Sequence, residues 1–231
     1  MVFWHYQAAH LRGVNRVVHV LSGCTRGTSG NDEYEAKPRS DCYDGGEGDD
    51  LIESNFNHGG HFTAFGGPGN DTMNGGWWMD NFDGGPGNDK IAGGPNEDRL
   101  RGGPGDDTIH GGFTYDNGSV GTDRMYGDDG NDTLIHEYGS ADMTGGRGAD
   151  TFRIESRFTT PNHHGGTQRV TIRDFNKAEG DRIEVLHAQD GNLSRSLNQF
   201  MKSANIDVDL GSLGSLPAKQ FVQADGSLIV R

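Results

Sequence analysis

Single apolar residues recur through the middle of the chain, mostly nine residues apart, and each lies in a polar or glycine-rich neighbourhood. In a β-strand, a side chain flanked by polar neighbours points to the opposite face from both of them. The spacing therefore predicts very short strands, each with one side chain pointing inward. The predicted inward residues are Tyr34, Tyr43, Ile52, Met73, Phe82, Ile91, Leu100, Ile109, Met125, Leu134, Met143 and Phe152.

The residues between these apolar positions repeat as well, in the pattern G-G-x-G-x-D-x-U-x, where U is apolar. Glycines at positions 1, 2 and 4 permit a backbone that other residues would strain, and position 6 supplies a carboxylate. A strand and a turn in every nonapeptide predict an all-β fold. We expect a right-handed parallel β-roll, a β-solenoid with two repeats in each coil.

Two repeats per coil place alternate turns on opposite edges of the roll. The first edge receives the turns that begin at 27, 45, 66, 84, 102, 127 and 145. All seven keep Gly at position 4 and Asp at position 6, and six have Asn or Asp at position 5. Oxygen-bearing side chains at positions 5 and 6 point to alternate neighbours, which suits Ca²⁺ because this cation prefers oxygen ligands.

The first edge is therefore the predicted metal edge, with up to six Ca²⁺ in the gaps between its seven turns and few or none on the other edge. The predicted ligands are Asp32, Asp50, Asp71, Asp89, Asp107, Asp132 and Asp150 at position 6, Asn31, Asp49, Asn70, Asn88, Asp106 and Asn131 at position 5, and Gly66, Gly84, Gly102 and Gly145 of the turns.

The second edge breaks the pattern, because only its last turn, HEYGSA at 136, has Gly at position 4, and that turn lacks the Asp. Two insertions also fall on this edge, at 54–65 and 117–122. One interpretation is that turns without metal accumulate arbitrary loop residues. The other is a platform for a glycan or a protein ligand. Its candidate residues are His58, His61, Trp77, Trp78, Glu97, Phe113, Tyr115 and His136.

Charge and composition restrict the classes of molecule that the protein is expected to bind. Only 31% of the chain is hydrophobic, Gly is present 39 times, and the net charge is −14. This charge repels nucleic acid and attracts cations. No apolar run is long enough for a transmembrane span. The first 24 residues are interrupted by His and Arg, so they make a poor cleavable signal peptide.

These nonapeptides resemble the calcium-binding repeats of the RTX family, and the resemblance covers residues 27 to 153. The segment RVTIRDFNKAEGDRIEV at 169–185 is similar to the D-F-x-x-x-x-G-D-x-I segment that follows such rolls in secreted bacterial proteins. The final QADGSLIVR resembles an uncleaved type I secretion signal. The resemblance implies Ca²⁺ held between stacked turns and an extracellular protein of a Gram-negative bacterium.

Three regions follow: an N-terminal strand or incoming coil at 1–26, the roll at 27–153, and a small C-terminal α+β cap at 154–231. In the cap, 169–174 and 182–186 are predicted strands. Leu193, Leu197, Phe200 and Met201 lie on one face of a predicted helix. Such a cap closes the open end of a solenoid.

Cys24 and Cys42 are the only cysteines, and they lie one coil of 18 residues apart. Equivalent residues of adjacent parallel strands are about 4.8 Å apart, which a disulfide accepts. We therefore predict a disulfide between them. The alternative is two free thiols in a reduced cytoplasmic protein.

No catalytic motif is present: HEYGS at 136 lacks the second His of a zinc protease, and neither a G-x-S-x-G nor a P-loop occurs. The leading hypothesis is a secreted protein that folds on binding Ca²⁺ and presents its second edge to a glycan or a cell-surface protein. The alternative is an extracellular polysaccharide-active enzyme with its site on that edge. A glycan-binding screen with product analysis separates the two.

Overall fold

The computed structural model describes residues 20–21, 23–36, 41–54, 60–112, 121–137, 139–156, 168–187 and 206–209. These residues form two sheets, of ten and eight strands. The ten-stranded sheet contains β1 (Val20–Leu21), β2 (Cys24–Arg26), β4 (Asp41–Asp44), β6 (Phe62–Phe65), β8 (Asn81–Asp83), β10 (Arg99–Pro104), β12 (Thr122–Asp129), β14 (Ser140–Arg147), β16 (Gln168–Ile172) and β18 (Ile206–Asp209). The eight-stranded sheet contains β3 (Glu33–Glu35), β5 (Leu51–Glu53), β7 (Thr72–Asn74), β9 (Lys90–Ala92), β11 (Thr108–His110), β13 (Thr133–His136), β15 (Thr151–Ser156) and β17 (Arg182–His187).

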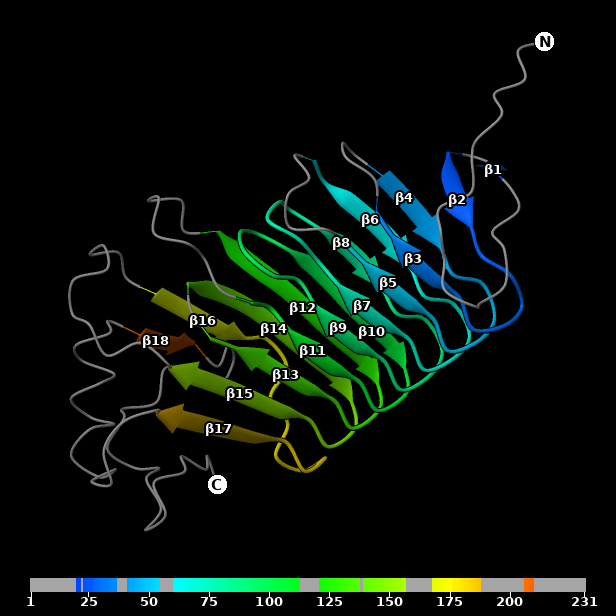
Figure 1. Ribbon diagram of the computed structural model, residues 1–231. Helices are drawn as coiled ribbons and strands as arrows, with labels where there is room; N and C mark the ends of the chain where they lie inside the picture. The colour runs from blue at the N-terminus through cyan, green and yellow to red at the C-terminus, as the bar shows by residue number, and fades with distance from the viewer. Residues whose placement is uncertain are drawn as a thin grey trace.

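The two sheets form a parallel β-roll, as the nonapeptide period predicts. From β2 onwards, successive strands alternate between the sheets, and from β4 onwards each pairs in parallel with the strand two places earlier. Figure 1 shows the strands stacked side by side, with a row of tight turns along the first edge. The described part of the chain contains no helix, and so none that is long and apolar enough to cross a membrane.

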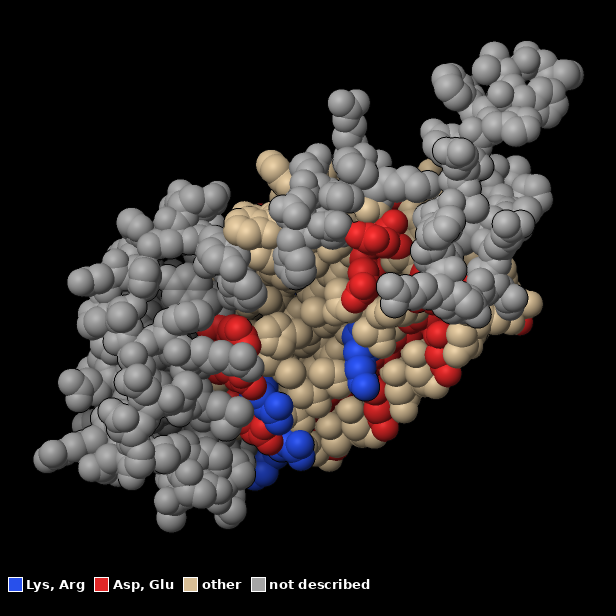
Figure 2. All heavy atoms as spheres, viewed as in Figure 1, with Lys and Arg blue, Asp and Glu red and all other residues tan. Residues whose placement is uncertain are grey.

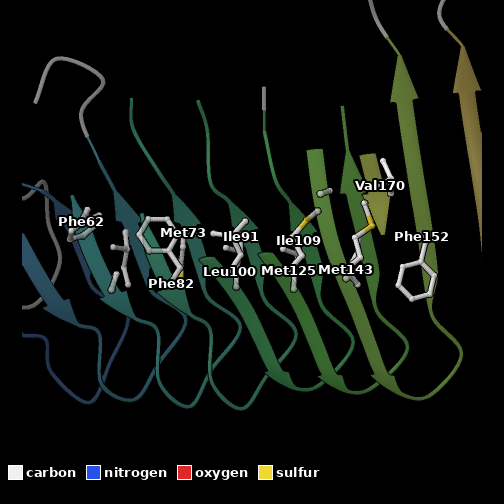
Figure 3. Packing of buried hydrophobic residues seen from close by; sticks show 14 of the residues in the cluster. Phe62, Met73, Phe82, Ile91, Leu100, Ile109, Met125, Met143, Phe152 and Val170 are labelled. Carbon is white, nitrogen blue, oxygen red and sulfur yellow. The ribbon is translucent and has the colours of Figure 1, made fainter. Parts of the chain in front are cut away.

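The core is a narrow column of side chains between the sheets, and all twelve predicted inward residues are buried in it. Strand register aligns them, so that Ile91 of β9 lies beside Met73 and Ile109 of the neighbouring strands. Figure 3 shows this column along the roll. The 54–65 insertion adds two further core residues, because Phe62 and Ala64 are also buried.

The N-terminal end is closed differently from the prediction of a continuous coil. Strand β2 does pair in parallel with β4, but β1 turns back and pairs with β2 in antiparallel orientation. Cys24 and Cys42 form the predicted disulfide, with their Cα atoms 4.4 Å apart. The bond joins β2 to β4 across one coil.

The C-terminal end keeps the two predicted strands, which the structure places at β16 and β17. Ile172 of β16 continues the register of Met143, and Ile183 of β17 continues that of Phe152. Phe175 covers the last coil, with its ring centroid 6.4 Å from that of Phe152. The predicted helical face at Leu193, Leu197, Phe200 and Met201 lies outside the described residues.

Candidate metal-binding edges

Each first-edge turn encloses a small space that only glycine leaves open. In the turn that begins at Gly84, the next two glycines have left-handed backbones, with φ +101° at Gly85 and +145° at Gly87. A Cβ atom on Gly84 would lie 2.2 Å from Asp89 Oδ2 and 2.8 Å from the carbonyl oxygen of Gly102. A carboxylate oxygen and the carbonyl oxygen of the next coil therefore converge on the space that this missing side chain leaves.

The position 6 aspartates are linked by a hydrogen-bond ladder that runs through the whole first edge. The backbone N–H of Asp71 donates to Asp89 Oδ1 at 2.7 Å, and that of Asp89 donates to Asp107 Oδ1 at 2.8 Å. The same bond joins every successive pair from Asp32 to Asp150. The ladder fixes one carboxylate oxygen of Asp50 and of each later aspartate of the row on the preceding coil.

The second carboxylate oxygen is left without a partner. Six first-edge aspartates are buried and have an Oδ2 atom with no hydrogen-bond donor, and Asp32 has an unpartnered Oδ1 instead. A buried anionic oxygen without a partner carries a large desolvation cost unless a cation or a donor compensates it. The six aspartates with a free Oδ2 are Asp50, Asp71, Asp89, Asp107, Asp132 and Asp150.

Burial also raises the pKa of these carboxyl groups far above the ordinary value for Asp. The pKa rises to about 6 for Asp89 and Asp150, and to about 7 for Asp50, Asp71 and Asp132. Desolvation is the main cause, and nearby carboxylates add to it. The aspartates are thus held where their anionic form lacks stabilisation, which a bound divalent cation would supply.

The residues fit Ca²⁺ by their chemistry, because carboxylate and carbonyl oxygens are its preferred ligands. Among the described residues, no three His, Cys, Asp or Glu side chains converge on one point. Backbone carbonyls, such as that of Gly102 beside the Asp89 carboxylate, must therefore complete each site. The glycines of the turns contribute by what they leave open: a Cβ on Gly66, Gly102 or Gly145 would also come within 2.2 Å of the aspartate oxygen of its own turn.

The position 5 residues, which the sequence also suggests as ligands, lie on the outer rim. Their side-chain oxygens point to the following coil: Asn70 Oδ1 accepts from the Asn88 backbone N–H at 2.9 Å, and Asn88 Oδ1 accepts from that of Asp106 at 2.9 Å. Positions 5 and 6 thus point to opposite neighbours. The remaining members form the same rim ladder and are exposed: Asn31, Asp49, Asp106 and Asn131.

The second edge carries a shorter carboxylate row, which the turn pattern did not predict. The backbone N–H of Asp80 donates to Asp98 Oδ1 at 2.7 Å, and that of Asp98 donates to Asp123 Oδ1 at 3.0 Å. All three aspartates are buried. Asp98 keeps an unpartnered Oδ2, and desolvation raises its pKa to about 9. Phe62 and Ala141 take position 6 in the coils on either side and end this row.

The sequence held a signal for this row. Asp80 and Asp98 stand two residues before the inward Phe82 and Leu100, as the first-edge aspartates stand before their own inward residues, and Asp123 stands two residues before Met125 beyond the insertion. These aspartates do not fit the repeat pattern because their turns lack Gly at position 4. Asn96 takes that position with φ +88°, and Asn is one of the few residues other than Gly that adopt this conformation readily.

The structure brings together only part of the predicted ligand platform. Trp77 and Trp78 are 41% and 49% exposed, with Met79 beside them at 47%. His61 is also exposed, and its Nδ1 lies 3.0 Å from the Met79 carbonyl oxygen. Glu97 lies one coil further on and forms an ion pair with Arg124.

Of the four other members of the predicted platform, the structure describes only His136. His136 does not reach the surface: it is 1% exposed, so it cannot belong to an exposed platform. The three others lie outside the described residues: His58, Phe113 and Tyr115.

The acidic character of the surface is uneven. Figure 2 shows one face of the roll, where acidic side chains lie in separate patches with a broad uncharged area between them. Several surface acids are paired with arginine, including Asp83 and Asp128 with Arg101. The buried carboxylate oxygens without a partner lie at the edges of the roll.

Fold and edges together define a parallel β-roll whose coils are joined by rows of carboxylates suited to a hard cation. Residues 63–77, 81–116 and 117–135 match the family of RTX calcium-binding nonapeptide repeats, in four copies. The roll thus contains RTX calcium-binding nonapeptide repeats over these residues. Neither curated proteins nor solved structures gave a match to it.

Proposed function

We propose that this protein binds several Ca²⁺ ions between its coils, and that it folds outside the cell when calcium becomes available. The observation that carries the proposal is the row of buried, unpartnered Asp oxygens, each facing a space left open by glycine. Extracellular calcium-binding modules work at about 0.1 to 1 mM, so the affinity is expected in that range. RTX repeats are typical of secreted bacterial proteins, which supports an extracellular location.

Folding coupled to binding follows from the balance of charge and burial. Without cations, successive carboxylates of one row lie on adjacent strands, and strands in a sheet are about 4.8 Å apart. Most strands contribute a single side chain to the core, so little apolar surface is buried. This burial does little to offset the repulsion between the carboxylates and the conformational entropy that a chain with 39 glycines loses on folding. Binding free energy thereby becomes folding free energy.

The two rows set the expected number of ions. Seven aspartates on the first edge, Asp32 to Asp150, define up to six gaps. The second row, Asp80 to Asp123, adds gaps on the opposite edge, where the turn pattern alone predicts few or none.

A calcium titration followed by circular dichroism tests the proposal, with one matched pair of variants from a single turn. Asp89→Asn removes a buried carboxylate charge and should raise the calcium midpoint of folding several-fold. Asn88→Ala removes the exposed neighbouring side chain and should leave the midpoint within about twofold. A wild-type protein fully folded in EGTA at pH 7.5 would contradict the proposal. Equal shifts in both variants would instead assign the position 5 oxygens to the sites.

A ligand-binding role for the second edge is favoured by one observation, the exposed Trp77, Trp78 and Met79 in a single turn. Aromatic side chains presented in this way suit glycan or protein docking, since aromatic stacking contributes about 0.5 to 1.5 kcal/mol per pair beyond buried area. We propose a glycan as the first ligand class to screen.

Trp77→Ala/Trp78→Ala should retain calcium-dependent folding, because both side chains are exposed, and should lose glycan-array binding by at least tenfold. Asn88→Ala serves as the control, since it changes an exposed turn residue on the other edge. A double variant that fails to fold in saturating calcium would show that the tryptophans are structural.

A further inference from the structure

The second-edge turn that begins at His136 differs from the turns before it at two linked positions, which are both described. His136 stands at position 1, where the preceding turns of this edge have Gly93 and Gly111. The register confirms the equivalence: the Gly93 N–H donates to the His110 carbonyl, and the Gly111 N–H donates to the Ile135 carbonyl that directly precedes His136. Ala141 stands at position 6, aligned with Asp123.

These two positions share one space in every regular turn. A Cβ on Gly93 would lie 2.4 Å from Asp98 Oδ2, and a Cβ on Gly111 would lie 2.7 Å from Asp123 Oδ2. A side chain at position 1 is therefore incompatible with a position 6 carboxylate that points into the space of the same turn. In the turn that has Ala36 at position 1, the Asp41 carboxylate instead accepts a hydrogen bond from the Tyr34 hydroxyl. Residues 136–141 have lost the carboxylate and gained the side chain, so the two changes compensate each other sterically.

The imidazole is built into the turn and is not a surface side chain. His136 is 1% exposed, and its Nε2 lies 3.2 Å from the carbonyl oxygen of Gly139 in the same turn. A carbonyl only accepts, so Nε2 carries the proton and donates. Burial lowers the pKa of His136 to about 4, so the ring is neutral at physiological pH.

We propose that His136 replaces the metal ion of its turn, with Ala141 making room for the ring, so that the second row of calcium sites ends at Asp123. The imidazole N–H satisfies a turn carbonyl, and the ring fills the space that the carboxylate has in the preceding turns. The row then requires neither an ion nor a buried charge at this position. The inference rests on the proposed binding of calcium between coils.

Restoring the ordinary residues tests this substitution. His136→Gly/Ala141→Asp should bind one more Ca²⁺ than the wild-type protein when ions are counted by native mass spectrometry at saturating calcium. A double variant that binds the wild-type number, or that does not fold in saturating calcium, would overturn the inference. The wild-type count itself tests the proposed function separately, because a wild-type protein without calcium ions fails before the difference is measured.

The reciprocal exchange in the first row is the matched control. The turn that begins at Gly102 also has Gly at position 4, and the three atoms nearest to a Cβ on Gly102 all belong to Asp107, so Gly102→His/Asp107→Ala reproduces both changes in a similar setting. This variant should fold in calcium and bind at least one ion fewer. Failure to fold, or an unchanged count, would count against the inference.

A measurement without substitutions completes the test. Anomalous diffraction at long wavelength locates each Ca²⁺ in crystals of the calcium-loaded wild-type protein. We expect no ion within the 136–141 turn. An ion bound by His136 Nδ1, the ring nitrogen left without a partner, would make the residue a ligand and refute the inference.

Discussion

At the scale of single residues, each turn depends on a few positions that adopt a left-handed backbone conformation. Position 4 is left-handed in regular first-edge turns, with φ +145° at Gly87 and +143° at Gly105. Asn96 has φ +88° at the same position on the second edge. It also donates a side-chain hydrogen bond to the Trp77 carbonyl one coil earlier. A single residue thus supplies both the turn conformation and a contact between coils.

Asn96→Val should destabilise the calcium-loaded protein by about 1 to 2 kcal/mol, because a β-branched residue does not adopt a left-handed backbone without strain. Asn96→Gly should stay closer to wild type, since it keeps the backbone and loses only the side-chain bond. Urea unfolding in saturating calcium measures both. Equal stability of the two variants would show that the backbone conformation is not what selects Asn here.

At the scale of elements, the short strands were predictable because one inward side chain defines each of them. Strands of three residues allow a single buried centre, so the apolar position located the strand and the nine-residue spacing located its partner. The reversal of β1 was not predictable in this way. An antiparallel pair of two residues depends on a local turn at Gly23, where φ is +95°. This turn is not part of the nine-residue repeat, so the repeat does not predict it.

The candidate site also has one part that the sequence predicts and one part that it does not. The aspartates were identifiable from their fixed distance to the inward residue, whereas the direction of each side chain depends on hydrogen bonds between coils. The burial of His136 also depends on the residue at position 6 of its own turn. His136 and Ala141 are therefore informative only as a pair. A sequence pattern that scores each position separately cannot register that dependence.

The disulfide stabilises the N-terminal end of the roll, where it joins β2 to β4. Opening it in Cys24→Ser/Cys42→Ser removes a loop closure across 18 residues, which contributes about 3 kcal/mol. Coils of a solenoid contact only their neighbours, so the loss should remain near the N-terminal end. Hydrogen exchange in calcium should show faster exchange in β2 and β4 and unchanged protection in β13 and β15. Reducing agent should have no effect on the variant, which serves as the control.

At the scale of the whole molecule, proton binding should compete with calcium. The folded pKa values of the buried aspartates, about 6 to 9, lie above the ordinary Asp value of 3.8. The calcium-free folded state therefore binds more protons than the unfolded state between pH 4 and pH 8, and its stability falls as the pH rises through this window.

In EGTA, circular dichroism should therefore show more β-structure at pH 5 than at pH 8, because protonation removes the repulsion within each row. In saturating calcium the dependence should reverse, since protons must leave before the ions bind. Asp98→Asn should weaken the calcium-free dependence, because Asp98 has the highest of these pKa values. A calcium-free protein with equal signal at both pH values would contradict the role assigned to the buried carboxylates.

The bond between Cys24 and Cys42 also makes the two ends of the roll mechanically unequal. Because each coil is attached only to its neighbours, tension on the chain loads the outermost coil and opens one strand ladder at a time. The covalent link holds β2 against β4, so the first coil cannot be peeled away while the link is intact. Under load the roll should unwind from the end that carries β17 and β18, and its mechanical strength should be that of its last coils.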